Sequence, residues 1–307
     1  MDISIKCNQL EVRYCVNKGM LRCIDSYEFT IHKPYAVQVC IKEMGIRIIT
    51  MSCVEEIQAT TLYSIMLDLE RLLQIFDGAF IPLEDITLWG KEDVNLYKSL
   101  TVHLKAQRLN YFSSAKFVSV QSDRILHYED VLDESIFSLW KKILEELGVV
   151  NQMYLYATSD CGLTNDIKCA FLVELSESLV EIIGKDNIRL QRLPNEKGNL
   201  KPCLRTIINN YGQIVFQNEI DNDIEKILTC LVNTRVNIMH IKLKQRNPRF
   251  DGSEATLYAI KMNYLYRSVL LQLLGIDEKM YVEKLKKRMA YIDDWNGIQN
   301  KLFERLK

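Results

Sequence analysis

Hydrophobic and polar positions alternate in the first part of the chain, and this alternation predicts β-strands. The alternating segments are residues 3–5, 10–16, 37–41 and 46–48. Between residues 54 and 76 the hydrophobic spacing changes to the helical period. The apolar stripe of this predicted helix consists of Ile57, Leu62, Ile65, Leu69, Leu72 and Phe76, and Gly78 and Pro82 end it. From Tyr97 to Val120 the period returns to two, so we predict strands there, with alternating positions Leu100, Val102, Leu104, Phe117, Val118 and Val120.

From about Leu132 onward the pattern predicts helices almost throughout. The expected helices cover residues 133–147, 164–183, 200–209, 220–243, 253–274 and 277–305, the last of them broken. Gly275 lies where the fifth of these helices should end. We therefore predict an α+β protein with two domains. A β-rich N-terminal domain with a packed helix covers residues 1–130, and an all-α helical bundle covers residues 131–307.

The composition is that of a folded protein, with 48% hydrophobic and 26% charged residues in a chain of 307. No stretch reaches 18 apolar residues without a charge, so we expect no membrane-spanning helix. The first residues lack the basic-then-apolar order of a secretory signal peptide. The nine cysteines are odd in number and contain no C-x-x-C pair. These features favour reduced thiols in the cytoplasm over a disulfide framework or a zinc site.

Charge is balanced over the whole chain but separated along it. The formal net charge of −1 excludes a uniformly basic protein that packages nucleic acid. Residues 1–130 carry 14 basic and 17 acidic side chains, and residues 131–234 carry 10 and 15. Residues 235–307 carry 15 basic and 8 acidic side chains, a net charge of +7. The charge pattern therefore allows a confined RNA site in the last quarter of the chain.

The most informative segment runs from Leu231 to Arg249. On a helix with 100° per residue, Arg235 and His240 lie on opposite borders of a narrow apolar stripe. A continuous polar row follows spacings of four, three and four, and consists of Asn233, Asn237, His240 and Lys244. Because imidazole titrates near neutral pH, a histidine at the edge of a packed stripe is a candidate for proton transfer.

Phosphodiester transfer in RNA needs a group that takes the 2′-hydroxyl proton and positive charge on the phosphorane-like transition state. His240 could move the proton and Arg235 could hold two phosphate oxygens. No metal or other cofactor is needed for this chemistry, and a two-fold dimer would double both groups. A basic run without an acid could follow the RNA backbone, and consists of Lys242, Lys244, Arg246 and Arg249. The spacing of one Arg and one His is by itself weak evidence, because a surface helix capped by a histidine explains it equally well.

The wider pattern resembles the HEPN superfamily, specifically its Apea-like branch. The motif of that family is an arginine, four to six residues, then a histidine, near the end of a long helix that a loop and another long helix follow. Arg235 and His240 are separated by four residues, and the flanking segments come in the order of the family, at 171–180, 200–208 and 257–276. The resemblance covers residues from about 150 to 276. The segment Phe76–Leu83 also looks like part of the β-rich domain that precedes this type of HEPN domain.

The resemblance implies a helical bundle that dimerises through the motif helices and cleaves RNA without a metal, in a defence or toxin-type system. Arg235 would bind the scissile phosphate, His240 would act as the acid–base group, and an antitoxin or regulatory protein is a candidate partner. The family often has a polar residue directly after the arginine, where this chain has Val236, so Asn237 is the candidate substitute. Glu177 is a candidate orienting acid, although Glu174, Glu177 and Glu181 together are more simply a solvated or salt-bridged helix face. The alternative is a catalytically silent HEPN module that dimerises or binds RNA.

Overall fold

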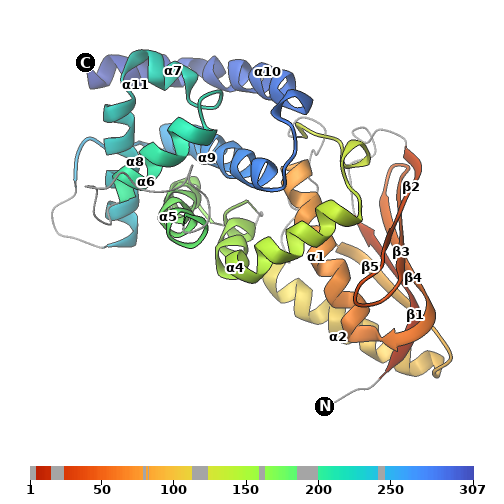
Figure 1. Cartoon of the computed structure of the whole chain (residues 1–307). Helices are drawn as coiled ribbons and strands as arrows, with labels where there is room; N and C mark the ends of the chain where they lie inside the picture. Colours follow the sequence, from red (N-terminus) through yellow and green to blue (C-terminus); the bar gives the residue numbers. More distant parts are fainter. Residues whose placement is uncertain are drawn as a thin grey trace. The chain divides into compact units, whose positions relative to one another are not determined.

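The computed structural model describes residues 5–14, 24–78, 81, 83–112, 124–158, 163–184, 200–240 and 246–307 (Figure 1). The chain forms two compact units, and each is described by itself. The first consists of Met1–Lys141 with Ser159–Cys161, and the second of Lys142–Thr158 with Gly162–Lys307. None of the described helices combines the length and the apolar character needed to cross a membrane.

The first unit is built on a five-stranded antiparallel sheet. Its strands are β1 (Lys6–Tyr14), β2 (Ile24–Ile31), β3 (Val37–Glu43), β4 (Arg47–Gln58) and β5 (Leu83–Trp89). Their order across the sheet is β2-β3-β4-β1-β5 (Figure 1). Every second residue along β3 is fully buried, at Val37, Val39 and Ile41. The alternation seen in the sequence therefore marks the face of the sheet that packs into the core.

Helix α1 (Ala59–Asp77) contacts β1 and β4 and closes this core. Its predicted stripe is buried from Leu62 to Phe76. The helix begins at Ala59 rather than at residue 54, because β4 continues as far as Gln58. Gly78 ends it in the left-handed conformation (φ 76°), with its N–H donating to the Gln74 carbonyl at 2.8 Å. Glycine adopts this conformation without the steric cost that a Cβ brings.

The strands predicted between Tyr97 and Leu104 are wrong, because residues Val94–Phe112 form helix α2. Leu100 and Leu104 are buried together with Tyr97, whereas Val102 is 67% exposed. Positions three and four apart share one face of a helix, and the single exposed valine between them imitated an alternation of period two. The remainder of that prediction, from Phe117 to Val120, lies outside the described residues. Strands β2 and β5 were not predicted.

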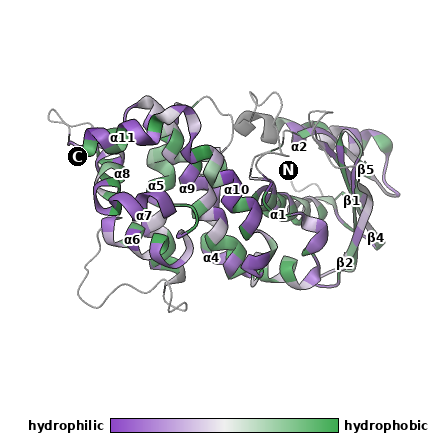
Figure 2. Ribbon diagram, turned by 90° about the horizontal axis from the view of Figure 1, so that it is seen from above, coloured by the Kyte–Doolittle hydropathy of each residue, from purple (hydrophilic) through white to green (hydrophobic). Residues whose placement is uncertain are grey.

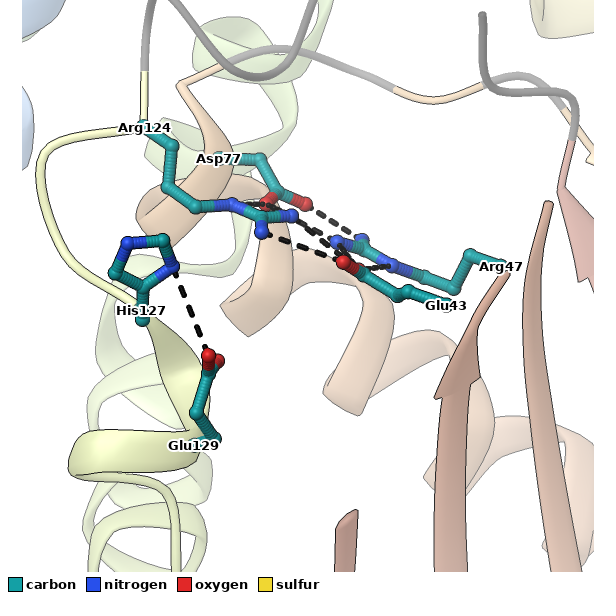
Figure 3. Close-up of polar contacts among 6 residues, drawn as sticks. All are labelled: Glu43, Arg47, Asp77, Arg124, His127 and Glu129. Atoms are coloured by element: carbon teal, nitrogen blue, oxygen red, sulfur yellow. Dashed lines mark hydrogen bonds and ion pairs between the residues drawn. The ribbon is translucent and has the colours of Figure 1, made fainter. Parts of the chain in front are cut away.

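Two arginines and two carboxylates form a buried ion network that fixes the segment after residue 123 in the first unit (Figure 3). The Arg47 Nη1 atom donates to Asp77 Oδ2 at 2.5 Å, and its Nε donates to Glu43 Oε1 at 2.6 Å. Arg124 reaches both acids, with Nε 2.9 Å from Asp77 Oδ1 and Nη2 3.2 Å from Glu43 Oε1. The centres of both guanidinium groups lie within 5.7 Å of the centre of the Tyr128 ring. The four charges balance, so the network can be buried.

The described residues between 134 and 306 are mostly helical, as the sequence predicts. The helices are α4 (Glu134–Thr158), α5 (Asn165–Ile183), α6 (Leu200–Tyr211), α7 (Gln217–Asn222), α8 (Ile224–Met239), α9 (Gly252–Leu273), α10 (Val282–Asp293) and α11 (Ile298–Leu306). Helix α5 contacts α6, α8 and α9, which makes it the centre of the bundle. Helix α10 is largely hydrophilic and buries only one narrow face, at Leu285, Met289 and Ile292 (Figure 2).

The helix predicted over residues 220–243 is two helices. Asp223 separates α7 from α8, and its carboxylate accepts the Lys226 N–H at 3.1 Å as the N-cap of α8. Helix α8 ends at Met239, so His240 is not a helical residue. Leu243 and Lys244, at the end of the predicted helix, lie outside the described residues.

A buried lysine ties the C-terminal helices to the bundle. Lys261 on α9 is fully buried, and its Nζ lies 2.6 and 2.7 Å from the two carboxylate oxygens of Glu219 on α7. The same Nζ lies 2.6 Å from Asp293 Oδ1 at the end of α10. Gln299 on α11 donates to Glu219 Oε1 at 2.6 Å. These contacts join four helices around one ammonium group.

Candidate active site

The structure brings Arg235 and His240 together at the end of α8. The Arg235 Nη1 atom lies 3.2 Å from His240 Nε2. Arg235 occupies the last turns of the helix, and His240 is its C-cap, with an extended backbone (φ −123°, ψ 97°). The His240 N–H still donates to the Val236 carbonyl at 3.0 Å, which anchors the residue to the helix end.

This contact depends on the end of the helix. Five residues of a continuous helix turn through about 500°, so the side chains at 235 and 240 would point about 140° apart. The sequence pattern therefore put the two residues on opposite borders of a stripe. Because the backbone leaves the helix after Met239, the His240 ring instead meets the Arg235 guanidinium. The predicted polar row through His240 is wrong for this reason.

The contact also fixes the hydrogen-bonding roles of the two groups. A guanidinium has five N–H donors and no acceptor, so Arg235 donates and His240 Nε2 accepts. An imidazole that accepts at Nε2 is neutral and carries its proton on Nδ1. Nε2 is the basic atom of such a ring, and its lone pair thus points at the guanidinium of Arg235.

Glu174 on α5 is the third residue of the site and comes from a second helix. Its Oε2 forms an ion pair with Arg235 Nε, and the two side chains are 26% and 17% exposed. Arg235 thus contacts Glu174 through Nε and His240 through Nη1. Three of its five N–H groups, one on Nη1 and two on Nη2, have no acceptor among the described residues. A cationic site with vacant donors and a base beside it can bind an anion and accept a proton.

Glu177, the orienting acid expected from the sequence, forms no ion pair or hydrogen bond with the described residues. It lies three residues after Glu174 on α5, at about 60° around the helix. The sequence placed both glutamates on one face. Only the packing of α5 against α8 decides which of them reaches Arg235.

Asn237 holds the loop that follows the site. Its Nδ2 donates to the Arg246 carbonyl at 2.9 Å, and its Oδ1 accepts the Arg246 N–H at 2.8 Å. The structure therefore joins Asn237 to the loop and not to the Arg235–His240 pair. Two neighbours on α8, which sequence reasoning did not assign to this task, continue the attachment. Asn233 Nδ2 donates to the Pro248 carbonyl at 2.9 Å, and Thr234 Oγ1 accepts the Phe250 N–H at 2.9 Å.

Two of the four predicted RNA-binding residues lie within the described chain. Arg246 is exposed and Arg249 is half-buried, both in the loop that Asn237 holds, whereas Lys242 and Lys244 lie outside the described residues. The far end of the loop is fixed as well, because Arg305 Nη2 donates to the Arg249 carbonyl at 3.1 Å. Arg305 also pairs at 2.6 Å with Glu254, which closes a capping box with Asp251 at the start of α9.

The start of α8 is held by a surface ion cluster. Glu225 accepts hydrogen bonds from Arg205 Nε at 2.8 Å and Nη2 at 3.0 Å, and its Oε2 lies 3.0 Å from Lys201 Nζ. The hydrogen bond from Arg205, with help from Lys201, outweighs partial burial and lowers the pKa of Glu225 to about 2. Both basic residues come from α6, so this cluster aligns α6 with the helix that carries the site.

In the part of the chain that the structure describes, no three His, Cys, Asp or Glu side chains gather in a way that could hold a metal ion. Residues 148–280 match the family described as Apea-like HEPN. This range contains α5, α6, α8 and α9 together with Glu174, Arg235 and His240. No curated protein and no solved structure matches the chain.

Proposed function

Residues 148–280 are an Apea-like HEPN domain, and from this premise we propose that the protein is a metal-independent endoribonuclease. HEPN domains are often ribonucleases, so the family supports this class of activity. The observation that carries the proposal is the contact of 3.2 Å between Arg235 Nη1 and His240 Nε2. This contact supports the proposal because a guanidinium can bind a phosphate and an imidazole can accept a proton, and cleavage of RNA requires both functions.

In the proposed reaction, the 2′-hydroxyl of a ribose attacks the adjacent phosphorus. When the phosphate draws the Arg235 N–H away from His240 Nε2, the freed Nε2 takes the hydroxyl proton while the bond between O2′ and phosphorus forms and the bond between phosphorus and O5′ breaks. The products are a 2′,3′-cyclic phosphate and a 5′-hydroxyl end. Arg235 binds two non-bridging phosphate oxygens through its vacant N–H groups, which stabilises the charge of the transition state.

The departing O5′ must receive a proton, and one protomer supplies a single histidine at this position. HEPN domains commonly dimerise, and a two-fold pairing of α8 would place a second His240 near the same phosphate. We assign the protonation of O5′ to the His240 ring of that second copy, which must carry a proton on Nε2 to act as the acid and therefore cannot accept from its own Arg235. Arg246 and Arg249 would bind neighbouring phosphates of the RNA, together with Lys242 and Lys244.

The test is cleavage of single-stranded RNA by purified protein in the presence of EDTA. The wild type should produce ends with a cyclic phosphate, and Arg235→Ala and His240→Ala should each abolish cleavage. His103→Ala, a substitution of an exposed histidine on α2, is the matched control and should cleave as the wild type does. Cleavage that persists in both site variants would reject the assignment.

The proposed biological setting is a defence or toxin-type system. Expression of the wild type should then slow bacterial growth, while expression of the folded His240→Ala variant should not. Equal toxicity of both proteins would separate growth inhibition from this site. Recovery of growth when the product of a neighbouring gene is expressed together with the wild type would indicate an antitoxin or regulatory partner.

A silent HEPN module is the second candidate function. Val236 stands where the family often has a polar residue, and its side chain is only 8% exposed. Asn237, the candidate substitute, is occupied by the Arg246 backbone. If the protein is such a module, the wild type should not cleave RNA. The His240→Ala variant should still bind RNA.

A further inference from the structure

Arg235 lies between an acid and a base that come from different elements. Glu174 on α5 pairs with its Nε, and His240 at the end of α8 contacts its Nη1. We infer that Glu174 is a positioning residue, which orients Arg235 so that the guanidinium faces His240 and keeps its remaining donors for phosphate. This inference rests on the function proposed above.

The guanidinium group of Arg235 is rigid. Its three nitrogens lie in one plane, so a partner that fixes Nε also fixes the direction of Nη1. A free arginine side chain has several rotatable bonds, and the loss of rotamer entropy opposes any single arrangement. Arg235 is 17% exposed and Glu174 is 26% exposed, so the pair is shielded from water more than a surface ion pair is. One carboxylate can therefore hold the arrangement that the reaction needs.

His240 needs this support because, among the described residues, Arg235 is the one side chain that forms a hydrogen bond with its ring. Its backbone has left α8, so the helix does not dictate where the ring points. The donor at Nη1 determines that Nε2 keeps its lone pair and that the neutral ring carries its proton on Nδ1. Glu174 thereby acts through Arg235 on the tautomer of His240.

The charge of Glu174 has a separate effect on substrate binding. A carboxylate beside Arg235 neutralises part of the attraction for an RNA phosphate. Glu174→Gln keeps an oxygen that accepts from Nε but removes the negative charge. We expect this variant to retain kcat and to have a lower KM, because the phosphate no longer meets a like charge. Glu174→Ala removes both properties, so its kcat should fall by about 10- to 100-fold.

Two other roles for Glu174, a purely structural one and an inhibitory one, predict different results. If Glu174 only stabilised the fold, activity per folded molecule would be unchanged in Glu174→Ala. If it blocked the site, both variants would raise kcat. Glu146→Ala, which removes an exposed glutamate from α4, is the matched control for charge. Glu177→Ala tests the competing acid on α5, and a loss of kcat there equal to that of Glu174→Ala would overturn the inference.

The decisive readout does not need nuclease activity. Nitrogen-15 NMR of the imidazoles reports the tautomer of His240, whose signals are identified by their loss in His240→Ala. We expect the Nδ1–H tautomer in the wild type and in Glu174→Gln, and a shift toward the Nε2–H tautomer in Glu174→Ala. Glu174→Met, which keeps the side-chain volume, replaces the alanine variant if that protein does not fold. An unchanged tautomer without the Glu174 acceptor would overturn the inference, whereas a wild type without EDTA-resistant cleavage would overturn the proposed function alone.

Discussion

The side chain of Asn237 forms two hydrogen bonds with the backbone of Arg246. Its Nδ2 donates to the Arg246 carbonyl at 2.9 Å, and its Oδ1 accepts the Arg246 N–H at 2.8 Å. Both polar atoms of the amide are thus used by the loop that follows the site. These hydrogen bonds hold the backbone of Arg246, an exposed residue, near the end of α8. Asn237 therefore affects RNA through the position of the loop.

Asn237→Ala should weaken RNA binding more than it slows chemistry. The variant loses two hydrogen bonds to backbone, each worth about 1 kcal/mol, so the loop becomes more mobile. We expect KM to rise several-fold while kcat stays close to that of the wild type. Steady-state kinetics on a short RNA measures both. A large fall in kcat at unchanged KM would contradict this account and indicate that Asn237 takes a direct part in the reaction.

Arg124→Met should destabilise the first unit strongly. The substitution leaves Glu43, Asp77 and Arg47 buried with one excess negative charge. Removing one partner of a buried ion network costs about 3–5 kcal/mol. Urea denaturation followed by circular dichroism should show this loss in the free energy of unfolding. Arg13→Met is the matched control, because Arg13 is 49% exposed and its pair with Glu11 should contribute less than about 1 kcal/mol.

Lys261→Met should destabilise the helical bundle, and the effect should depend on pH. The variant leaves the carboxylates of Glu219 and Asp293 together without their shared cation. Burial already raises the pKa of Glu219 in the wild type, and the Lys261 ammonium, which opposes this shift, is lost in the variant, so the pKa should rise further. A raised pKa in the folded state means that stability is lost as pH rises. The thermal midpoint of the variant should therefore fall further below the wild type at pH 8 than at pH 5, and an equal difference at both values would contradict this account.

Glu225 should stabilise the protein at neutral pH and cease to do so in acid. Its pKa is lowered from 4.5 to about 2, chiefly by the hydrogen bond from Arg205. A group whose pKa is depressed by folding contributes stability above its unfolded pKa and loses that contribution as pH falls toward its folded value. The thermal midpoint of Glu225→Gln should lie below that of the wild type at pH 7, and the gap should narrow between pH 4.5 and the lower limit of measurement. A gap that widens in acid would reject this role.

Much of the fold follows from local patterns in the sequence. The α1 stripe is continuous from Leu62 to Phe76, about four turns, and the helix ends at Gly78 where a left-handed residue is needed. From Glu134 onward the sequence repeats with the helical period, and the described residues there are mostly helical. The error at Leu100 and Leu104 arose because a short segment with one exposed valine fits both periods.

Residues close together in the chain are enough to predict the α+β class, the resemblance to Apea-like HEPN domains, and Arg235 and His240 as the candidate site, because composition, periodicity and motif spacing are properties of neighbouring residues. Three features of the site depend on the folded arrangement: α8 ends at Met239, His240 turns back to Arg235, and Glu174 is the acid beside them. A helix end depends on the loop that Asn237 and its neighbours hold, and the choice between Glu174 and Glu177 depends on the rotation of α5 against α8. Both are set by packing between segments distant in sequence, which no local pattern encodes.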